Sequence, residues 1–136
     1  GKISNGRLRL AKYPEISATC IRVPVEDGHL ASIEIQLSKR ISKNQFIKAV
    51  AGYQNPIAKL RLPSAPREFI KYLKEEDRPQ TRLDRDFERG MGITFGRLRK
   101  DNFGWKLVAL SHNTIRGAAG GAILLAELLK VKGYLD

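Results

Sequence analysis

Two stretches near the start of the chain carry patterns of apolar and polar residues that predict a β-hairpin. Residues 16–23 (ISATCIRV) are rich in β-branched side chains, and residues 30–37 (LASIEIQL) alternate between an apolar row and a mainly polar row. Asp27 and Gly28 between them are typical of a two-residue turn. The two segments are expected to pair antiparallel, with one apolar face turned towards the core.

This register carries Arg22 and His29 onto the core-side face. A buried guanidinium must be paired or must bind an anion, because burying it alone is costly. On pattern alone, an ion pair between Arg22 and Glu26 or Asp27, with His29 as a turn residue, is favoured over a binding site. Cys20 falls on the same face with no His or Lys beside it, which favours a buried structural thiol over a nucleophile.

The middle of the chain begins with an amphipathic helix. Ser42 and Gln45 form a capping-box pattern at its start, and apolar residues at helical spacing predict a helix over about 43–51. Residues 57–62 (IAKLRL) alternate like a short strand, which the Pro-Ser-Ala-Pro run at 63–66 ends.

A long polar connection follows and leads into a second hairpin and a helix. Within the connection, residues 78–86 (RPQTRLDRD) are dense in alternating charge, which suits a solvated loop or a salt-bridged contact with another subunit or domain. Residues 92–99 and 105–111 are strand-like, and residues 115–133 form a helix that is apolar nearly all round and expects cover on several sides. The order of elements predicts an α+β fold with an antiparallel or mixed sheet and helices packed on it.

Length and charge limit the possible functions. The 136 residues, 42% of them hydrophobic, suit a single domain. The net charge of +11 attracts anions, but basic residues are interleaved with acidic ones and no nucleic-acid-binding fingerprint is present. Nucleic-acid binding is therefore disfavoured. Small anionic substrates or an acidic partner account for the charge equally well, and a basic, non-catalytic nucleic-acid-binding module stays as the alternative from another class.

Other classes are disfavoured by what the sequence lacks. No run approaches the roughly 20 apolar residues that a membrane span needs, and no signal pattern opens the chain, so a cytoplasmic protein without a membrane partner is expected. With one cysteine and two histidines, neither a disulfide framework nor a metal site is expected. The first residue is Gly rather than Met, which suggests a piece of a longer protein.

A Gly-rich helix start carries the second histidine. His112 and Asn113 precede a G-x-x-G-G run, which differs from the G-x-G-x-x-G dinucleotide fingerprint. Gly117, Gly120 and Gly121 are better explained as close-packing positions. Asn113 is expected either to cap the helix or to offer its amide to a ligand.

Several motifs in the same order resemble one enzyme family. The segments are ISATCIRVPVEDGH, PSAP, EEDRPQTRLDRD, GMGITFGRL and VALSHNTIRGAAGGAILLAELL, which extend from about residue 16 to the end. Together they resemble the C-terminal portion of aspartate-β-semialdehyde dehydrogenases of the archaeal and fungal type. The resemblance implies an NADP-dependent oxidoreductase that reduces aspartyl-β-phosphate to aspartate semialdehyde, on the route to lysine, threonine and methionine.

The resemblance also implies roles for three residues. The family's Arg and His in an R-x₆-H arrangement match Arg22, for the substrate α-carboxylate, and His29, as general acid/base. Asn113 matches the asparagine of the S-x-N-x-x-x-G-A-A-G segment, whose amide lies near the nicotinamide. Cys20 matches a non-catalytic cysteine.

The resemblance implies that much of the enzyme lies outside these residues. The family's Rossmann nucleotide-binding domain, its nucleophilic cysteine and a Glu/Lys segment precede the matched region, so residues 1–136 are expected to be the C-terminal part of the catalytic and dimerisation domain. That part is similar to the C-terminal domain of glyceraldehyde-phosphate dehydrogenases. A homo-oligomeric parent, dimer or tetramer, is implied, and the fragment alone is expected to be inactive. N-acetylglutamyl-phosphate reductase and malonyl-CoA reductase are the nearest rivals.

Overall fold

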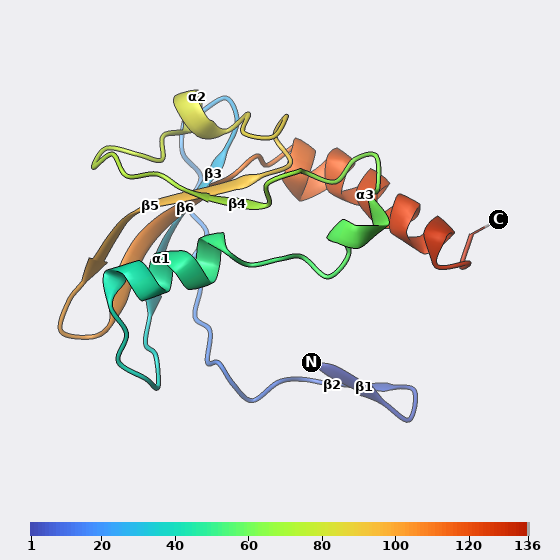
Figure 1. Cartoon of the computed structure of the whole chain (residues 1–136), viewed down its shortest axis with the longest axis horizontal. Helices are drawn as coiled ribbons and strands as arrows, with labels where there is room; N and C mark the ends of the chain where they lie inside the picture. Colours follow the sequence, from blue (N-terminus) through green and yellow to red (C-terminus); the bar gives the residue numbers. More distant parts are fainter. Residues whose placement is uncertain (136) are drawn as a thin grey trace.

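A mixed four-stranded sheet forms the centre of the molecule. The computed structural model describes residues 1–135, and its main sheet has the order β3 (His29–Ile35), β6 (Trp105–Ser111), β5 (Ile93–Lys100), β4 (Ile70–Tyr72). β6 runs antiparallel to both of its neighbours, whereas β4 runs parallel to β5 (Figure 1). The predicted hairpin of residues 92–111 is confirmed as β5 and β6.

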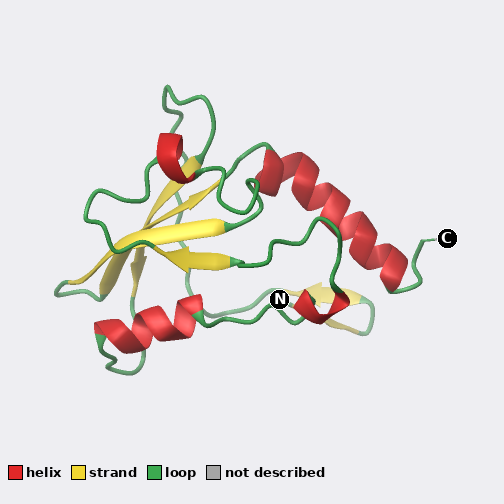
Figure 2. Ribbon diagram, turned by 45° about the horizontal axis from the view of Figure 1, so that its top comes forward, coloured by secondary structure: helices red, strands yellow, loops and turns green. Residues whose placement is uncertain are grey.

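Helices lie on both faces of this sheet. α1 (Lys43–Ala51) covers one face and the short α2 (Thr81–Asp84) lies over the other, while α3 (Gly120–Val131) extends beyond the ends of the strands (Figures 1 and 2). A π-helical turn, η2 (Ile115–Ala119), leads into α3, and η1 (Ala58–Leu60) is a single 3₁₀ turn. The α+β prediction is therefore confirmed. Within residues 1–135, no helix has the length and apolar character needed to cross a membrane.

The main core lies between α1 and the sheet. The predicted capping box is confirmed, since the Ser42 hydroxyl accepts from the Gln45 N–H at 3.2 Å and the Gln45 side chain accepts from the Ser42 N–H at 2.8 Å. The ring of Phe46 packs 5.4 Å from that of Trp105, centroid to centroid. The buried residues of this core are Phe46, Phe95, Leu98, Trp105 and Leu107.

A second, smaller core attaches α3 to the preceding loops. Leu62, Met91 and Leu124 are its buried members. A Cβ at Gly120 would lie 2.6 Å from the Met91 sulfur, so the close-packing prediction is confirmed there. Within residues 1–135, α3 buries only Leu124 and exposes the large side chains Ile123, Leu125 and Val131, so the described chain does not itself supply the expected cover.

The predicted N-terminal hairpin is wrong. Residues 10–28 form no strand, so β3 pairs on one side only, with β6 in the register His29 opposite Ser111, and it ends the sheet (Figure 1). Pro24 has no N–H for a ladder, and the turn residues after it are bound by other parts of the chain, as described below.

The structure also contains elements that the pattern did not predict. Residues 57–62 contain the 3₁₀ turn η1 rather than a strand, and Arg61 after it adopts a left-handed backbone with φ +48°. β4 lies further along the chain than that predicted strand. A small hairpin of β1 (Lys2–Ser4) and β2 (Arg7–Arg9) was missed, although the Asn-Gly pair between its strands is a standard turn signal.

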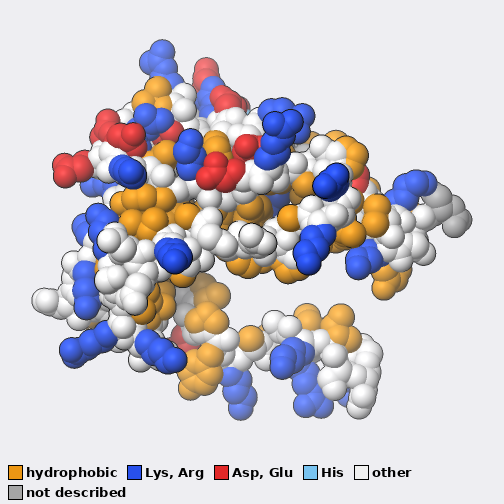
Figure 3. Space-filling model, viewed as in Figure 1, with side chains coloured by type: hydrophobic (Ala, Val, Ile, Leu, Met, Phe, Trp, Pro, Cys, Tyr) orange, Lys and Arg blue, Asp and Glu red, His pale blue; other side chains and the backbone are white. Residues whose placement is uncertain are grey.

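Charge is unevenly distributed over the surface. On the face drawn in Figure 3, acidic side chains gather towards the α2 side, whereas lysines and arginines are spread over the whole face. This face shows no continuous basic stripe, as the interleaved charges of the sequence led us to expect.

Loss of an aromatic ring from the main core tests this packing. We expect Phe46→Ala to lower the free energy of unfolding by about 4 kcal/mol, because it removes buried area and leaves a cavity beside Trp105. Phe103→Ala, at a ring that is 71% exposed, is the matched control and should change stability by less than about 0.5 kcal/mol. Urea denaturation measures both, and equal effects would contradict this assignment of the core.

Candidate functional site

The candidate site is built around a turn of residues 26–28 that leads into β3. Gly28 is buried and has φ +108°, a conformation that favours glycine. A Cβ there would lie 3.1 Å from side-chain atoms of both Leu110 and Thr81. The Gly28 N–H donates to Asn113 Oδ1 at 2.7 Å, so a residue just after β6 fixes the start of β3.

Two further side chains hold the same turn. Arg85 donates to Glu26 Oε2 at 3.0 Å, and the Thr114 hydroxyl donates to Asp27 Oδ1 at 3.3 Å. The ion pair between Arg22 and Glu26 or Asp27 favoured by the pattern is therefore wrong, because these carboxylates are engaged by Arg85 and Thr114 from distant parts of the chain. Arg85 and Thr114 were not singled out in the sequence, although Arg85 lies within the charged segment of residues 78–86 and Thr114 directly follows Asn113.

His29 begins β3 and directly follows this turn. Its position in the strand places its side chain on the same face as Ile33 and Ile35, which pack against the main core. At its own position near the strand end the imidazole is exposed. A solvent-accessible imidazole at a backbone-fixed position can exchange protons with a bound molecule.

Arg22 and Cys20 lie outside this arrangement. Both are exposed in the extended segment of residues 10–28, so the predictions of a core-side Arg22 and a buried Cys20 are wrong for this structure. Both depended on the hairpin that does not form. The structure thus brings His29 and Asn113 to one turn, through Gly28, and leaves Arg22 apart from it.

The charged segment of residues 78–86 supports the site from the α2 side. Asp84 is buried and accepts from Arg78 Nε at 2.7 Å and from the Gln80 N–H at 2.7 Å. Burial disfavours the charged carboxylate, but the hydrogen bonds from Arg78 and Gln80 outweigh it and lower the pKa of Asp84. The salt bridges in this segment lie within the chain, and they fix the loop that presents Arg85.

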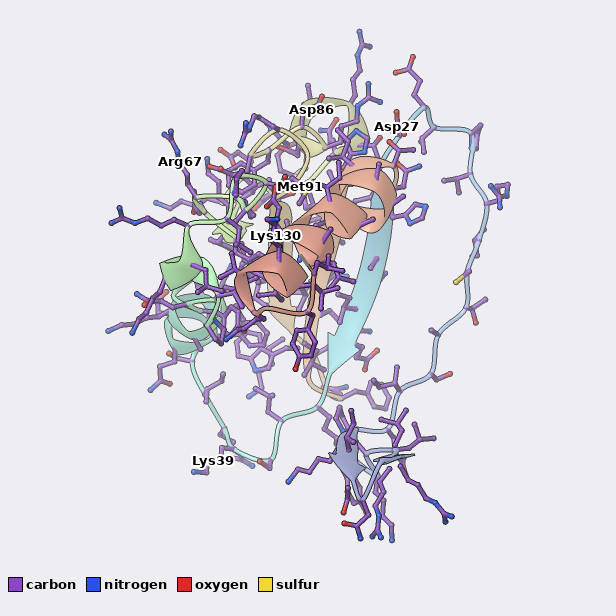
Figure 4. The ribbon with its side chains drawn as sticks, turned by 90° about the vertical axis from the view of Figure 1, so that its right-hand side faces the viewer. Asp27, Lys39, Arg67, Asp86, Met91 and Lys130 are labelled. Carbon is purple, nitrogen blue, oxygen red and sulfur yellow. The ribbon has the colours of Figure 1, made fainter. Side chains whose placement is uncertain are left out.

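His112 is the one buried histidine of the described chain. Its Nδ1 accepts from the Ile115 N–H at 3.3 Å and lies 3.2 Å from the Thr114 hydroxyl, while its Nε2 faces Asp86 Oδ1 at 3.7 Å. Asp27 and Asp86 lie at the same end of the molecule, beside the start of α3 (Figure 4). Residues 1–135 contain no cluster of His, Cys, Asp and Glu suited to a metal ion.

Comparison with known proteins assigns the family. The family model described as "Semialdehyde dehydrogenase, dimerisation domain" matches residues 1–116. The chain belongs to this semialdehyde dehydrogenase family. Among curated relatives, the aspartate-semialdehyde dehydrogenase of Aspergillus fumigatus is 45% identical over 126 residues, and the malonyl CoA reductase (NADP) of Metallosphaera sedula is 34% identical over 124.

A solved structure of the same family shares the fold. The crystal structure of aspartate semialdehyde dehydrogenase with NADP from Candida albicans matches with a TM-score of 0.72 and 41% identity, over 83% of this chain and 32% of that one. The Aspergillus match covers 88% of this chain and 35% of its relative, and the Metallosphaera match covers 89% and 35%. The chain spans about a third of the length of these semialdehyde dehydrogenase relatives.

Replacement of Asp84 tests the support beneath the turn. We expect Asp84→Asn to lower the free energy of unfolding at pH 7 by about 2 kcal/mol, because Arg78 loses its charged partner. Since the folded-state pKa of Asp84 is lowered from 3.8, its contribution is complete above that pH and is lost as the pH falls through the folded value.

The stability difference between wild type and Asp84→Asn should therefore narrow in acid. Urea denaturation from pH 7 down to pH 3 measures this difference. Asp77→Asn, at an exposed carboxylate in the same loop, is the control and should stay close to wild type. A pH-independent difference would show that the charge of Asp84 does not stabilise the fold.

Proposed function

We propose that this chain is the C-terminal part of the catalytic and dimerisation domain of an aspartate-semialdehyde dehydrogenase. The parent enzyme would reduce aspartyl-β-phosphate to aspartate semialdehyde with NADPH, in the cytoplasm, on the route to lysine, threonine and methionine. The family match over residues 1–116, with aspartate-semialdehyde dehydrogenases 45% identical, carries this proposal. The exposed His29 beside Asn113 supports it from the geometry.

In this proposal His29 is the general acid/base. Its ring is exposed while its backbone is fixed by β3 and by the bound turn before it, so a proton can be delivered at a defined place. Position and accessibility are the two properties that this task needs.

Arg22 would bind the substrate α-carboxylate. A planar guanidinium can make two parallel hydrogen bonds to a carboxylate, which fixes the orientation of the substrate as well as its position. For this role the exposed segment of residues 10–28 has to bring Arg22 to the His29 side of β3 in the complete enzyme. The pattern of residues 16–23 favours such an arrangement, because it predicts a strand beside β3.

Asn113 is the residue of this chain that suits the nicotinamide end of the cofactor. The turn engages only its Oδ1, which leaves the amide nitrogen for a carbonyl acceptor, and the neighbouring Gly117, Ala118 and Ala119 are small and exposed. NADPH, when bound, supplies the hydride for the reduction. The remaining cofactor contacts would come from a separate nucleotide-binding domain.

We propose that this nucleotide-binding domain packs against α3 and that the parent is a homo-oligomer. The exposed large apolar residues of α3 provide a surface for another domain, and the matched family is a dimerisation domain. Because the nucleophilic cysteine and the nucleotide-binding domain would lie elsewhere in the parent, the isolated chain should show no turnover with NADPH and aspartyl phosphate. Measurable turnover by the chain alone would overturn this division of roles.

Substitutions in the complete enzyme test the two site residues. His29→Ala should lower kcat by about a hundredfold or more, because the general acid/base is removed, with little change in Tm since the ring is exposed. Arg22→Lys should mainly raise KM for the amino-acid substrate, because lysine cannot make the forked contact. Steady-state kinetics measures both, and full activity in either variant would refute the assigned role.

The same assay separates the proposal from its rivals. Turnover with malonyl-CoA instead of aspartyl phosphate would favour the malonyl CoA reductase alternative, to which a 34% identical relative points. Turnover with N-acetylglutamyl phosphate would favour the other sibling reductase. Salt-dependent retention on nucleic acid, without any reductase activity, would favour the basic binding module.

A further inference from the structure

We propose that Thr114 and His112 are positioning residues that hold the turn of residues 26–28 and thereby orient His29. Neither side chain would touch the substrate. The inference rests on the proposed function, because it takes His29 as the general acid/base. It deepens that function by naming the side chains that keep this imidazole in place.

The Thr114 side chain forms a hydrogen bond with the Asp27 carboxylate. Its hydroxyl donates to Asp27 Oδ1 at 3.3 Å and lies 3.2 Å from His112 Nδ1. The hydroxyl has one proton, so it can donate to one of these two neighbours at a time. Which group donates to His112 Nδ1 therefore decides whether the Thr114 hydroxyl can donate to Asp27.

A hydrogen bond from the Ile115 backbone shows that Nδ1 of His112 is an acceptor. Its N–H donates to Nδ1 at 3.3 Å, so Nδ1 carries a lone pair and the proton of the neutral ring lies on Nε2. Nε2 faces Asp86 Oδ1 at 3.7 Å, and this carboxylate favours the same tautomer. With Nδ1 engaged by Ile115, the Thr114 hydroxyl can donate to Asp27.

His112 itself has little freedom to move. It is 5% exposed, and the Gly90 backbone packs so closely against its ring that a Cβ there would lie 3.1 Å from the ring. The main chain of residues 112–114 is therefore held firmly, and it presents the Asn113 amide and the Thr114 hydroxyl side by side to the turn.

These contacts act on His29 through the backbone. The turn is bound at Asp27 by Thr114 and at Gly28 by Asn113, and His29 is the next residue. The His29 ring is exposed, so its direction depends mainly on the backbone that enters β3. A loosened turn would misplace the imidazole without unfolding the domain, since misplacement by about 1 Å can cost up to a hundredfold in rate.

Thr114→Val in the complete enzyme tests the contact to Asp27. Valine keeps the shape and loses the hydroxyl, so we expect kcat for aspartyl phosphate reduction to fall about tenfold, with KM within twofold. Amide hydrogen exchange, measured by mass spectrometry on a peptide covering residues 24–30, should become faster while Tm changes little. Ser38→Ala, which removes an exposed hydroxyl from the loop between β3 and α1, is the control and should leave all three quantities unchanged.

A pair of variants at His112 separates positioning from packing. The Oδ1 of asparagine can take the place of Nδ1, so His112→Asn should stay within about threefold of wild-type kcat per folded enzyme. In His112→Gln the amide reaches the Nε2 position and the Ile115 N–H loses its acceptor, so kcat should fall about tenfold. Equal losses in the two variants would show that only the ring volume matters, and would overturn the role of Nδ1.

Two results would overturn the positioning role. Wild-type kcat and wild-type exchange in Thr114→Val would show that the hydroxyl does not hold the turn. Faster exchange with unchanged kcat would show that the turn does not orient His29. If the wild-type enzyme reduces none of the acyl substrates, the proposed function fails instead, and the exchange rates alone then decide whether Thr114 and His112 hold the turn.

Discussion

The hydrogen bond from the Gly28 N–H to Asn113 Oδ1 is the constraint on which the rest of the site depends. It joins residues 85 positions apart and forms at a buried backbone group that would be costly to leave unpaired. Because Gly28 adopts a positive φ against Leu110 and Thr81, a larger residue there would strain the backbone and crowd both side chains. The entry of β3 is thereby fixed, and with it the position of His29 opposite Ser111.

A second electrostatic unit supports this constraint from the opposite side of the turn. The buried Asp84 keeps its charge because Arg78 and the Gln80 N–H bind it, and these contacts fix the conformation of residues 78–84 around α2. Arg85 is the next residue and reaches Glu26, which extends the hold from the α2 segment to the turn. The charged segment of residues 78–86 thus makes two separate contacts. Asp84 binds Arg78 within the segment, and Arg85 binds Glu26 of the turn.

Sequence patterns of a few residues correctly predicted the elements whose formation depends on neighbouring residues. The Ser42 and Gln45 capping box and the hairpin of β5 and β6 are decided within a few residues, and the sequence predicted them. Whether a β-prone segment forms a strand depends on contacts made over the whole chain, so the pattern of residues 16–23 could not reveal that this segment stays unpaired here. Short-range alternation likewise misassigned residues 57–62, which contain a 3₁₀ turn followed by the left-handed Arg61.

The predicted site residues also differ in what places them. His29 and Asn113 were predicted from motifs far apart in sequence, and the structure joins them through Gly28. From the pattern, Arg22 was placed beside His29 by a hairpin register. That register needs residues 16–23 to pair with the free edge of β3, the strand at one end of the sheet. An edge strand offers unpaired N–H and C=O groups to any extended segment, so edge and segment remain complementary. The carboxylate-binding half of the proposed site thus depends on a strand pairing, whereas the proton-transfer half is already fixed by the turn.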